Sequence, residues 1–227
     1  MPAGLTLPEA LDGLAPLYDQ GTPHSDPIAQ LVWENIGYLI DDERRAVLFA
    51  AFAARIGLTA HQIIEAPAET LSEIAGRGGM NPMTRAERLR SIGTLTLEVC
   101  GGDLGATLRA LPVAQARTVL KRFPTIGDPG ADKILLFAGI AARPCLESNG
   151  LRALVRLGLC SQSSAYAPTY KAAMAVMAAQ LPLDMEILKR AYLILRAHGR
   201  ALCKRSEPLC APCPLDHGCL HVLAKGL

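Results

Sequence analysis

The chain has 227 residues, half of them hydrophobic and 19% charged, which excludes a disordered protein or a coiled coil and allows one large or two modest domains. Its 23 basic and 21 acidic residues leave a net charge of +2, which excludes a polybasic protein but not a local basic face. The sequence has no signal-peptide pattern and no apolar run of about 18 residues. We therefore expect a soluble, cytoplasmic protein, nucleoid-associated if bacterial, with no membrane partner.

Helix signals recur along the chain, whereas the alternating β-branched runs of strands are nearly absent. Capping boxes are predicted at two pairs, Thr6 with Glu9 and Thr59 with Gln62. Three capping side chains precede a Pro that would open a helix: Asp26, Asn81 and Asp128. One apolar helical face is predicted from Ile28, Leu31, Val32, Asn35, Ile36 and Leu39. These signals predict an all-α protein of about ten helices.

The C-terminal segment carries the strongest chemical signal. Four cysteines occur there with the spacing C-x6-C-x2-C-x5-C, at Cys203, Cys210, Cys213 and Cys219. Without an export signal, cysteines favour metal binding over disulfides. Spread-out thiolates suit a [4Fe-4S] cluster, while His217 and His221 keep a mixed zinc site open. The other cysteines, Cys100, Cys145 and Cys160, are expected in the core.

The run His198-Gly199-Arg200-x2-Cys203 and the cysteine spacing after it resemble the C-terminal signature of the endonuclease III family of DNA glycosylases. The resemblance implies a [4Fe-4S] cluster on the four cysteines. It also implies two helical domains with a DNA groove between them. Residues 25–138 would form a six-helix barrel, and residues 1–24 and 139–227 a discontinuous cluster domain. The expected partner is double-stranded DNA with a damaged or mismatched base, bound by a monomer.

A helix-hairpin-helix is predicted over residues 113–138. Residues 113–122 form its first helix, with a basic edge at Arg117, Lys121 and Arg122, and Phe123–Gly127 form the hairpin. Such a hairpin aims backbone N–H groups at a phosphate. The expected DNA-binding residues are Lys121, Arg122, Thr125, Ile126, Gly127, Gly130 and Lys133. Thr125 stands where the family usually has Gly, although a β-branched residue resists φ > 0.

The segment Leu146–Leu159 is similar to the family's catalytic helix, and it places Glu147 where the family has its catalytic Asp. A carboxylate there would stabilise positive charge on the sugar and activate water, with Ser148 and Asn149 as water or sugar ligands. If not catalytic, Glu147 would be a first-turn acid stabilised by the helix dipole.

Strand-cleaving family members carry a Lys where this chain has Pro129. Lys133, one helical turn later, is expected to contact phosphate or solvent. The sequence therefore predicts weak or no lyase activity.

Residues Trp33–Tyr38 and Asp41–Arg45 resemble the family helix that reaches the DNA stack. Tyr38, in place of a Gln, would either fill the gap left by a flipped base or pack in the core. Glu34 is a candidate base-pocket residue, and Trp33 is expected in the core. On a later helix Arg85, Arg88 and Arg90 are expected on a solvated face, with phosphate contact as the alternative.

Two functions of different kinds follow from these motifs. The first is a DNA N-glycosylase, a hydrolase that removes a flipped base, with Glu147 as its catalytic residue. The alternative is a catalytically silent iron-sulfur DNA-binding relative of endonuclease III. A zinc-dependent interaction module is a third and weaker hypothesis. The motifs do not specify the base.

Overall fold

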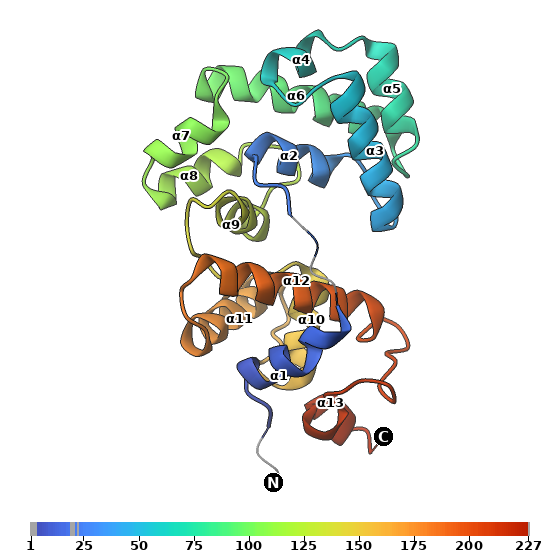
Figure 1. The fold of residues 1–227 in the computed structure, drawn as a ribbon, viewed down its shortest axis with the longest axis vertical. Helices are drawn as coiled ribbons and strands as arrows, with labels where there is room; N and C mark the ends of the chain where they lie inside the picture. The colour runs from blue at the N-terminus through green and yellow to red at the C-terminus, as the bar shows by residue number, and fades with distance from the viewer. Residues whose placement is uncertain (1–3, 19–20, 22, 227) are drawn as a thin grey trace. The chain divides into compact units, whose positions relative to one another are not determined.

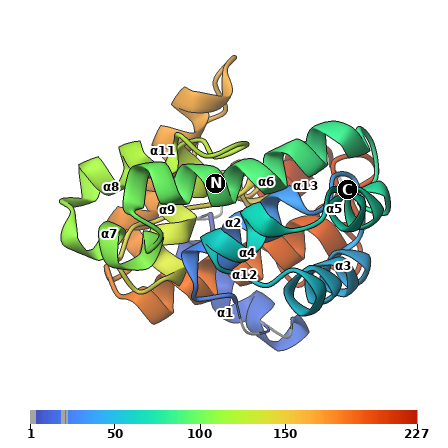
Figure 2. The same ribbon diagram turned by 90° about the horizontal axis from the view of Figure 1, so that it is seen from above.

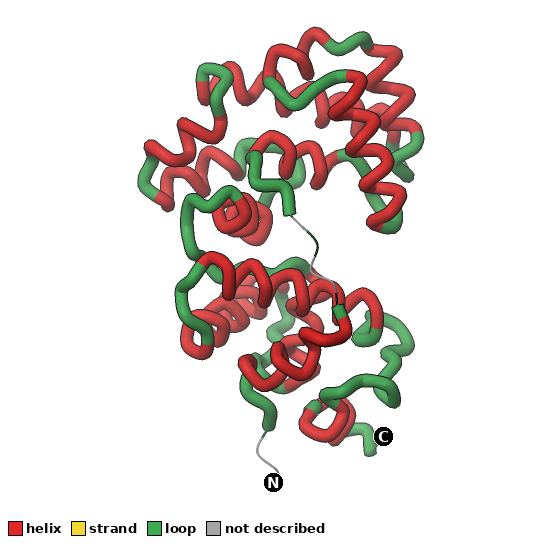
Figure 3. The backbone as a smooth tube through the Cα atoms, viewed as in Figure 1, coloured by secondary structure: helices red, strands yellow, loops and turns green. Residues whose placement is uncertain are grey.

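The computed structural model describes residues 4–18, 21 and 23–226, and over these residues the chain is helical (Figure 3). The described residues contain no β-strand, only an isolated bridge between Tyr38 and Gly79. The predicted all-α class is confirmed. Within the same residues, none of the helices combines the length and the apolar character needed to cross a membrane.

The chain divides into two compact units. The continuous unit spans Pro23–Ala141, and the discontinuous unit combines Met1–Thr22 with Ala142–Leu227. The helices of the continuous unit are α2 (Pro27–Asn35), α3 (Asp42–Arg55), α4 (Ala60–Glu65), α5 (Ala68–Gly76), α6 (Pro82–Cys100), α7 (Leu104–Ala110), α8 (Val113–Leu120) and α9 (Asp128–Phe137).

The long helix α6 organises the continuous unit, because α2, α4, α5 and α7 all pack against it (Figure 2). Its buried face includes Leu89 and Ile92. At Gly93 helix α4 comes so close that a Cβ would lie 2.8 Å from the Ala60 carbonyl oxygen. At the edge of this unit Trp33 is half-buried, in contact with the rings of His24 and Phe49.

The discontinuous unit is built around two adjacent helices (Figure 1). Its elements are α1 (Leu7–Leu14), a 3-10 turn (Ala15–Leu17), α10 (Ser148–Leu157), α11 (Tyr166–Gln180), α12 (Met185–Ala201), a second 3-10 turn (Asp216–Gly218) and α13 (Leu220–Leu223). Helices α10 and α12 share the most extensive helix contact, and α1 packs on α12 and α11. Buried leucines fill this core, among them Leu14, Leu154 and Leu195.

Most of the predicted helix starts are confirmed. Thr6 with Glu9 and Thr59 with Gln62 form capping boxes, and Asp26 accepts a hydrogen bond from the Ala29 N–H at 2.8 Å. At Asn81 the predicted helix start is confirmed, because α6 begins at Pro82. The predicted cap is wrong, since Asn81 is in the left-handed conformation (φ +56°) and its side chain makes no capping hydrogen bond.

Two further details of the prediction are also wrong. Asp128 is the first residue of α9, where its carboxylate pairs with Arg117 and Lys121 instead of capping the helix. Leu39 does not extend the apolar face of α2, since that helix ends at Asn35 and Leu39 is 76% exposed.

Candidate functional site

Glu147 is the N-cap residue of α10, and its side chain caps the first turn of this helix. Its Oε1 atom accepts hydrogen bonds from the backbone N–H groups of Asn149 and Gly150, each at 2.9 Å. Its Oε2 atom accepts one from Asn149 Nδ2 at 2.7 Å, and Ser148 Oγ lies 3.5 Å away. The structure therefore brings together three predicted site residues, Glu147, Ser148 and Asn149, and fixes the carboxylate at a helix start.

A chain of hydrogen bonds connects this carboxylate to the cysteine segment. Asn149 Oδ1 accepts from Arg152 Nη2 at 2.9 Å. The same guanidinium donates to the Gly199 carbonyl at 2.6 Å and to the Cys203 carbonyl at 3.0 Å. Burial lowers the pKa of Arg152, and the Cys203 thiolate charge opposes that shift. Arg152 thus joins the start of α10 to the end of α12.

Gly199, in the predicted signature run, permits the close approach of α12 to α10. A Cβ at this position would lie 2.4 Å from the Asn149 carbonyl oxygen. No side chain fits at that distance from backbone, so glycine is required where α12 passes the residue that holds Glu147.

All four predicted metal ligands, Cys203, Cys210, Cys213 and Cys219, line one pocket of the discontinuous unit. Burial raises the pKa of the Cys213 and Cys219 thiols, with the other thiolates adding to the shift. Among the described residues, no three His, Cys, Asp or Glu side chains lie close enough together to share one metal ion.

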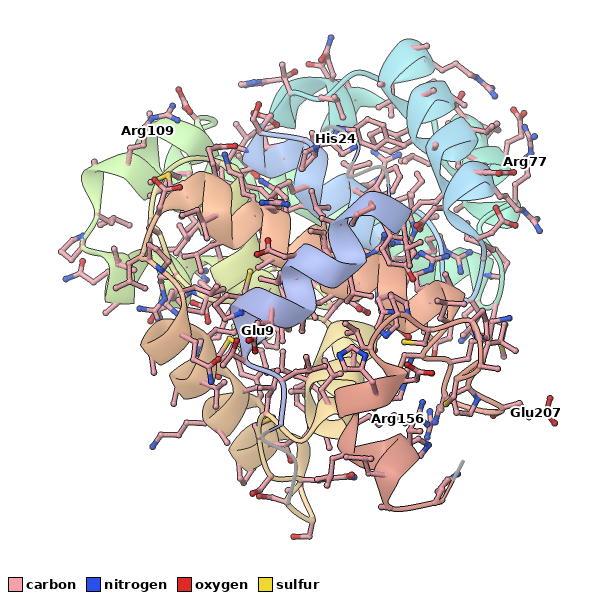
Figure 4. All side chains as sticks on the ribbon, turned by 60° about the horizontal axis from the view of Figure 1, so that its bottom comes forward. Glu9, His24, Arg77, Arg109, Arg156 and Glu207 are labelled. Carbon is pink, nitrogen blue, oxygen red and sulfur yellow. The ribbon has the colours of Figure 1, made fainter. Side chains whose placement is uncertain are left out.

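Arg156 and His198 complete this pocket. Figure 4 shows Arg156 beside the C-terminal segment, where its Nη1 atom donates to Cys203 Sγ at 3.5 Å and to the Lys204 carbonyl at 2.6 Å. His198 is 3% exposed, and burial lowers its pKa to about 4. Its Nδ1 atom lies 3.1 Å from the hydroxyl of Tyr18, whose pKa burial raises to about 12.

The predicted helix-hairpin-helix is present as α8, a hairpin and α9. Thr125 adopts φ +66°, the left-handed conformation that a β-branched residue resists. Its hydroxyl donates to Asn35 Oδ1 at 3.3 Å, and Asn35 Nδ2 donates to the Pro124 carbonyl at 3.2 Å. The buried Asn35 therefore connects the hairpin to α2. From the sequence, this residue was expected only as part of an apolar helical face.

The basic edge of α8 is largely paired with acids of α9. Arg117 Nε contacts the buried Asp132 at 2.7 Å, and Lys121 Nζ contacts Asp128 at 3.1 Å. Arg122 is exposed. In the hairpin itself Thr125 and Gly127 are exposed, Gly130 is half-buried and Ile126 is buried.

Lys133 points away from solvent and forms an ion pair with Glu34. The side chains are 12% and 35% exposed, so the pair is only partly accessible. Of the two contacts expected for Lys133, solvent or phosphate, the solvent contact is therefore wrong. Pro129, in the second position of α9, is half-buried.

Tyr38, Leu39, Met80 and Met83 form an apolar surface patch that no sequence pattern predicted. These residues are between 60% and 78% exposed. The Tyr38 N–H donates to the Gly78 carbonyl at 2.9 Å, so the loop that carries Tyr38 and Leu39 lies beside the loop that carries Met80. The core alternative for Tyr38 is thereby excluded. The sequence signal that could have predicted this patch is the pair of methionines, Met80 and Met83, on either side of Asn81-Pro82.

Two of the three arginines of α6 do not form the expected solvated face. Arg85 is 4% exposed and donates to the carbonyls of Ala75, Gly79 and Met80, the last two in the loop that carries Met80. Arg90 donates to the Ala66 carbonyl at 2.6 Å and also to that of Ile64. Only Arg88 is exposed.

No family model matches the chain. A provisionally named DNA repair glycosylase of Methanocaldococcus jannaschii is 24% identical over 159 residues, 70% of each chain. A trapped endonuclease III–DNA covalent intermediate is 19% identical, with a TM-score of 0.75 over 98% of this chain and 100% of that one. A thermostable thymine-DNA glycosylase is 14% identical, with a TM-score of 0.74 over 96% and 95%. This chain therefore has the fold of endonuclease III, which confirms the resemblance drawn from its motifs at the level of the fold.

Proposed function

We propose that this protein is a DNA glycosylase that hydrolyses the N-glycosidic bond of a flipped damaged or mismatched base in double-stranded DNA. The observation that carries the proposal is the Glu147 carboxylate, held by two backbone N–H groups and one side-chain amide at the start of α10. This arrangement occurs in a chain with the endonuclease III fold, and its sequence relative is named a DNA repair glycosylase. The protein would act as a cytoplasmic monomer.

In this reaction Glu147 acts on the sugar whose base leaves. Breaking the bond builds positive charge on the sugar ring, and a nearby carboxylate lowers the energy of that state. The same carboxylate accepts a proton from the attacking water. Asn149 and Arg152 position the carboxylate, since their hydrogen bonds hold it against α10 and α12.

The residues on α9 support hydrolysis without strand cleavage. Cleavage through a Schiff base needs an uncharged amine close to the sugar. Pro129 supplies no amine, and the Lys133 ammonium pairs with Glu34. The residual lyase activity is expected to be weak or absent.

DNA binding would use two features of the continuous unit. The hairpin before α9 offers the helix-start N–H groups that bind a phosphate, with Lys121, Arg122 and Lys133 nearby. The patch of Tyr38, Leu39, Met80 and Met83 offers apolar side chains of the kind that separate stacked bases. Glu34 would then line the base pocket.

We also propose that the four cysteines hold a [4Fe-4S] cluster. The donor set fits, because all four thiols line one pocket and Arg156 donates to the Cys203 sulfur. Each cysteine of such a cluster binds a different iron, so the four need not converge on one ion. When bound, the cluster cross-links a Pro-rich segment that has no extended helix of its own between Cys203 and the 3-10 turn at Asp216.

One observation favours the silent binder as a second candidate. Both Glu147 oxygens already accept hydrogen bonds within α10, so helix capping alone accounts for the position of this residue.

A panel of lesion duplexes separates these candidates. Oxidised pyrimidines, uracil and thymine opposite guanine, alkylated purines and abasic sites are each incubated with excess protein, then analysed with and without alkali. On the duplexes that carry a base at the target, strand breaks that need alkali support the monofunctional glycosylase. Tight binding to the panel without base release on any duplex would support the silent binder and reject the enzyme.

A further inference from the structure

A hollow of about 570 Å³, open to solvent, adjoins the start of α10 within the discontinuous unit. Three segments line it: the first turns of α10, the loop 162–165 with the start of α11, and Arg205 from the cysteine segment. Ser148 and Asn149, which contact the Glu147 carboxylate, form one wall. The hollow therefore begins beside the proposed catalytic group.

The hollow is suited to an anionic ligand. Three arginines and no carboxylate are among its lining residues. Arg152 and Arg156 are fixed by hydrogen bonds to backbone carbonyls of residues 199–205. Arg205 is exposed, and no hydrogen bond or ion pair engages its side chain within the described part of the chain. A guanidinium of this kind binds phosphate through two parallel N–H groups.

Tyr166 gives the hollow an aromatic platform. It is 48% exposed, and its ring stacks on Tyr170 with a centroid distance of 6.0 Å and an angle of 13°. Because Tyr170 is buried, it holds one face of the Tyr166 ring in place, while the Tyr166 ring itself remains half exposed. Burial and, to a lesser extent, the charge of Glu147 raise the pKa of the Tyr166 phenol. Rigid aromatic rings of this kind stack on unpaired bases.

The loop opposite is held in a fixed conformation. The buried Thr169 hydroxyl accepts from the Ser163 N–H at 3.0 Å and donates to the Ala165 carbonyl at 2.9 Å. This leaves the side chains of Gln162, Ser163 and Ser164 exposed along the wall. The hollow thus combines a cation, an aromatic face and fixed hydrogen-bonding groups, the three kinds of contact a nucleotide makes.

We propose that this hollow binds an unpaired nucleotide next to the target nucleotide on the same DNA strand, with its base on Tyr166 and its phosphate at Arg205. The inference rests on the proposed function, because Glu147 sets where the target sugar lies. The proposed site predicts that the protein binds more tightly to DNA in which the base next to the target is already unpaired than to DNA in which that base is paired.

A double-mutant cycle between protein and DNA tests the proposal. The probe is a duplex with a tetrahydrofuran abasic analogue at the target and an unpaired adenine as its neighbour, on the 5′ or the 3′ side. In a second duplex the neighbour is also the analogue, so its base is missing. Kd is measured by fluorescence anisotropy for wild type, Tyr166→Ala, Tyr166→Phe and the control Leu183→Ala, which changes an exposed side chain of the same unit.

We expect Tyr166→Ala to weaken binding by about 5- to 150-fold on one of the adenine duplexes and less than about twofold on its base-free partner. Tyr166→Phe and Leu183→Ala should stay within about twofold of wild type on both. Ser164→Glu, a surface change that adds a negative charge, should weaken the same adenine duplex and provides the test if Tyr166→Ala does not fold.

Equal losses on the two duplexes, or no loss on either side of the target, would overturn the inference. If the protein releases a base in the lesion panel but Tyr166→Ala weakens the two duplexes equally, only the proposed role of the hollow is rejected. Absence of both base release and a difference between the duplexes would reject the proposed function as well.

Discussion

Arg85 shows that a charged side chain belongs to the interior of the continuous unit. Its guanidinium donates to the Ala75 carbonyl of α5 and to the Gly79 and Met80 carbonyls in the loop before α6. We expect Arg85→Ala to lower the free energy of unfolding by about 2–4 kcal/mol, because buried carbonyls lose their donors. Arg88→Ala, on the exposed face of the same helix, should change it by less than about 0.5 kcal/mol. Urea denaturation measures both, and equal effects would contradict this role.

Thr125 illustrates how a residue can adopt a conformation that its type resists. The left-handed conformation costs about 1–2 kcal/mol for a residue with a Cβ. The hydrogen bond to Asn35 offsets about 0.5–1.5 kcal/mol of this conformational cost. The hairpin therefore keeps its positive φ without the family's glycine, and the compensation comes from α2, about 90 residues earlier.

The contact between α10 and α12 depends on Gly199. We expect Gly199→Ala to reduce stability by about 1–3 kcal/mol, since its Cβ would press on the Asn149 backbone. Base release should fall with it, because Asn149 holds Glu147. Gly76→Ala, where a Cβ would meet nothing within 4 Å, is the matched control. Thermal unfolding and single-turnover assays of the two variants test this, and an unchanged Gly199→Ala protein would refute it.

We expect the start of α9 to determine whether the protein cuts the DNA strand. Pro129→Lys would place an amine in the slot used by strand-cleaving members of the endonuclease III family. We expect borohydride to trap a covalent complex between this variant and abasic-site DNA, and no complex with the wild type. A trapped wild-type complex lost in Lys133→Ala would show instead that Lys133 leaves Glu34 and attacks the sugar.

Sequence patterns predicted elements whose signals are local. Capping boxes and the hairpin involve residues a few positions apart, and the structure has them where expected. The predictions for Asp128 and Arg85 were wrong because tertiary packing sets their partners. Asp128 pairs with Arg117 on α8, and Arg85 donates to carbonyls of α5 and of the loop before α6. The start of α10 was predicted from its resemblance, but no pattern encodes the Arg152 bonds to residues about 50 positions away.

Over the whole molecule, the cysteine pocket connects the C-terminal segment to α10 through Arg152 and Arg156. We expect anaerobically prepared protein to contain about four iron and four sulfide per chain. Cys213→Ala should lose most of this iron and unfold at a lower temperature. Cys160→Ala, at a half-buried cysteine outside the pocket, should keep both properties. Stoichiometric zinc in place of iron would reject the cluster.

The fold is that of endonuclease III, and we propose that Glu147 makes this protein a hydrolase. The most direct test is single-turnover base release by Glu147→Gln on the best substrate of the panel, with Glu69→Gln on the exposed surface of α5 as control. We predict a loss of about 100-fold or more in rate with little change in Kd, and wild-type behaviour for the control. A Glu147→Gln protein that releases base at the wild-type rate would contradict the account.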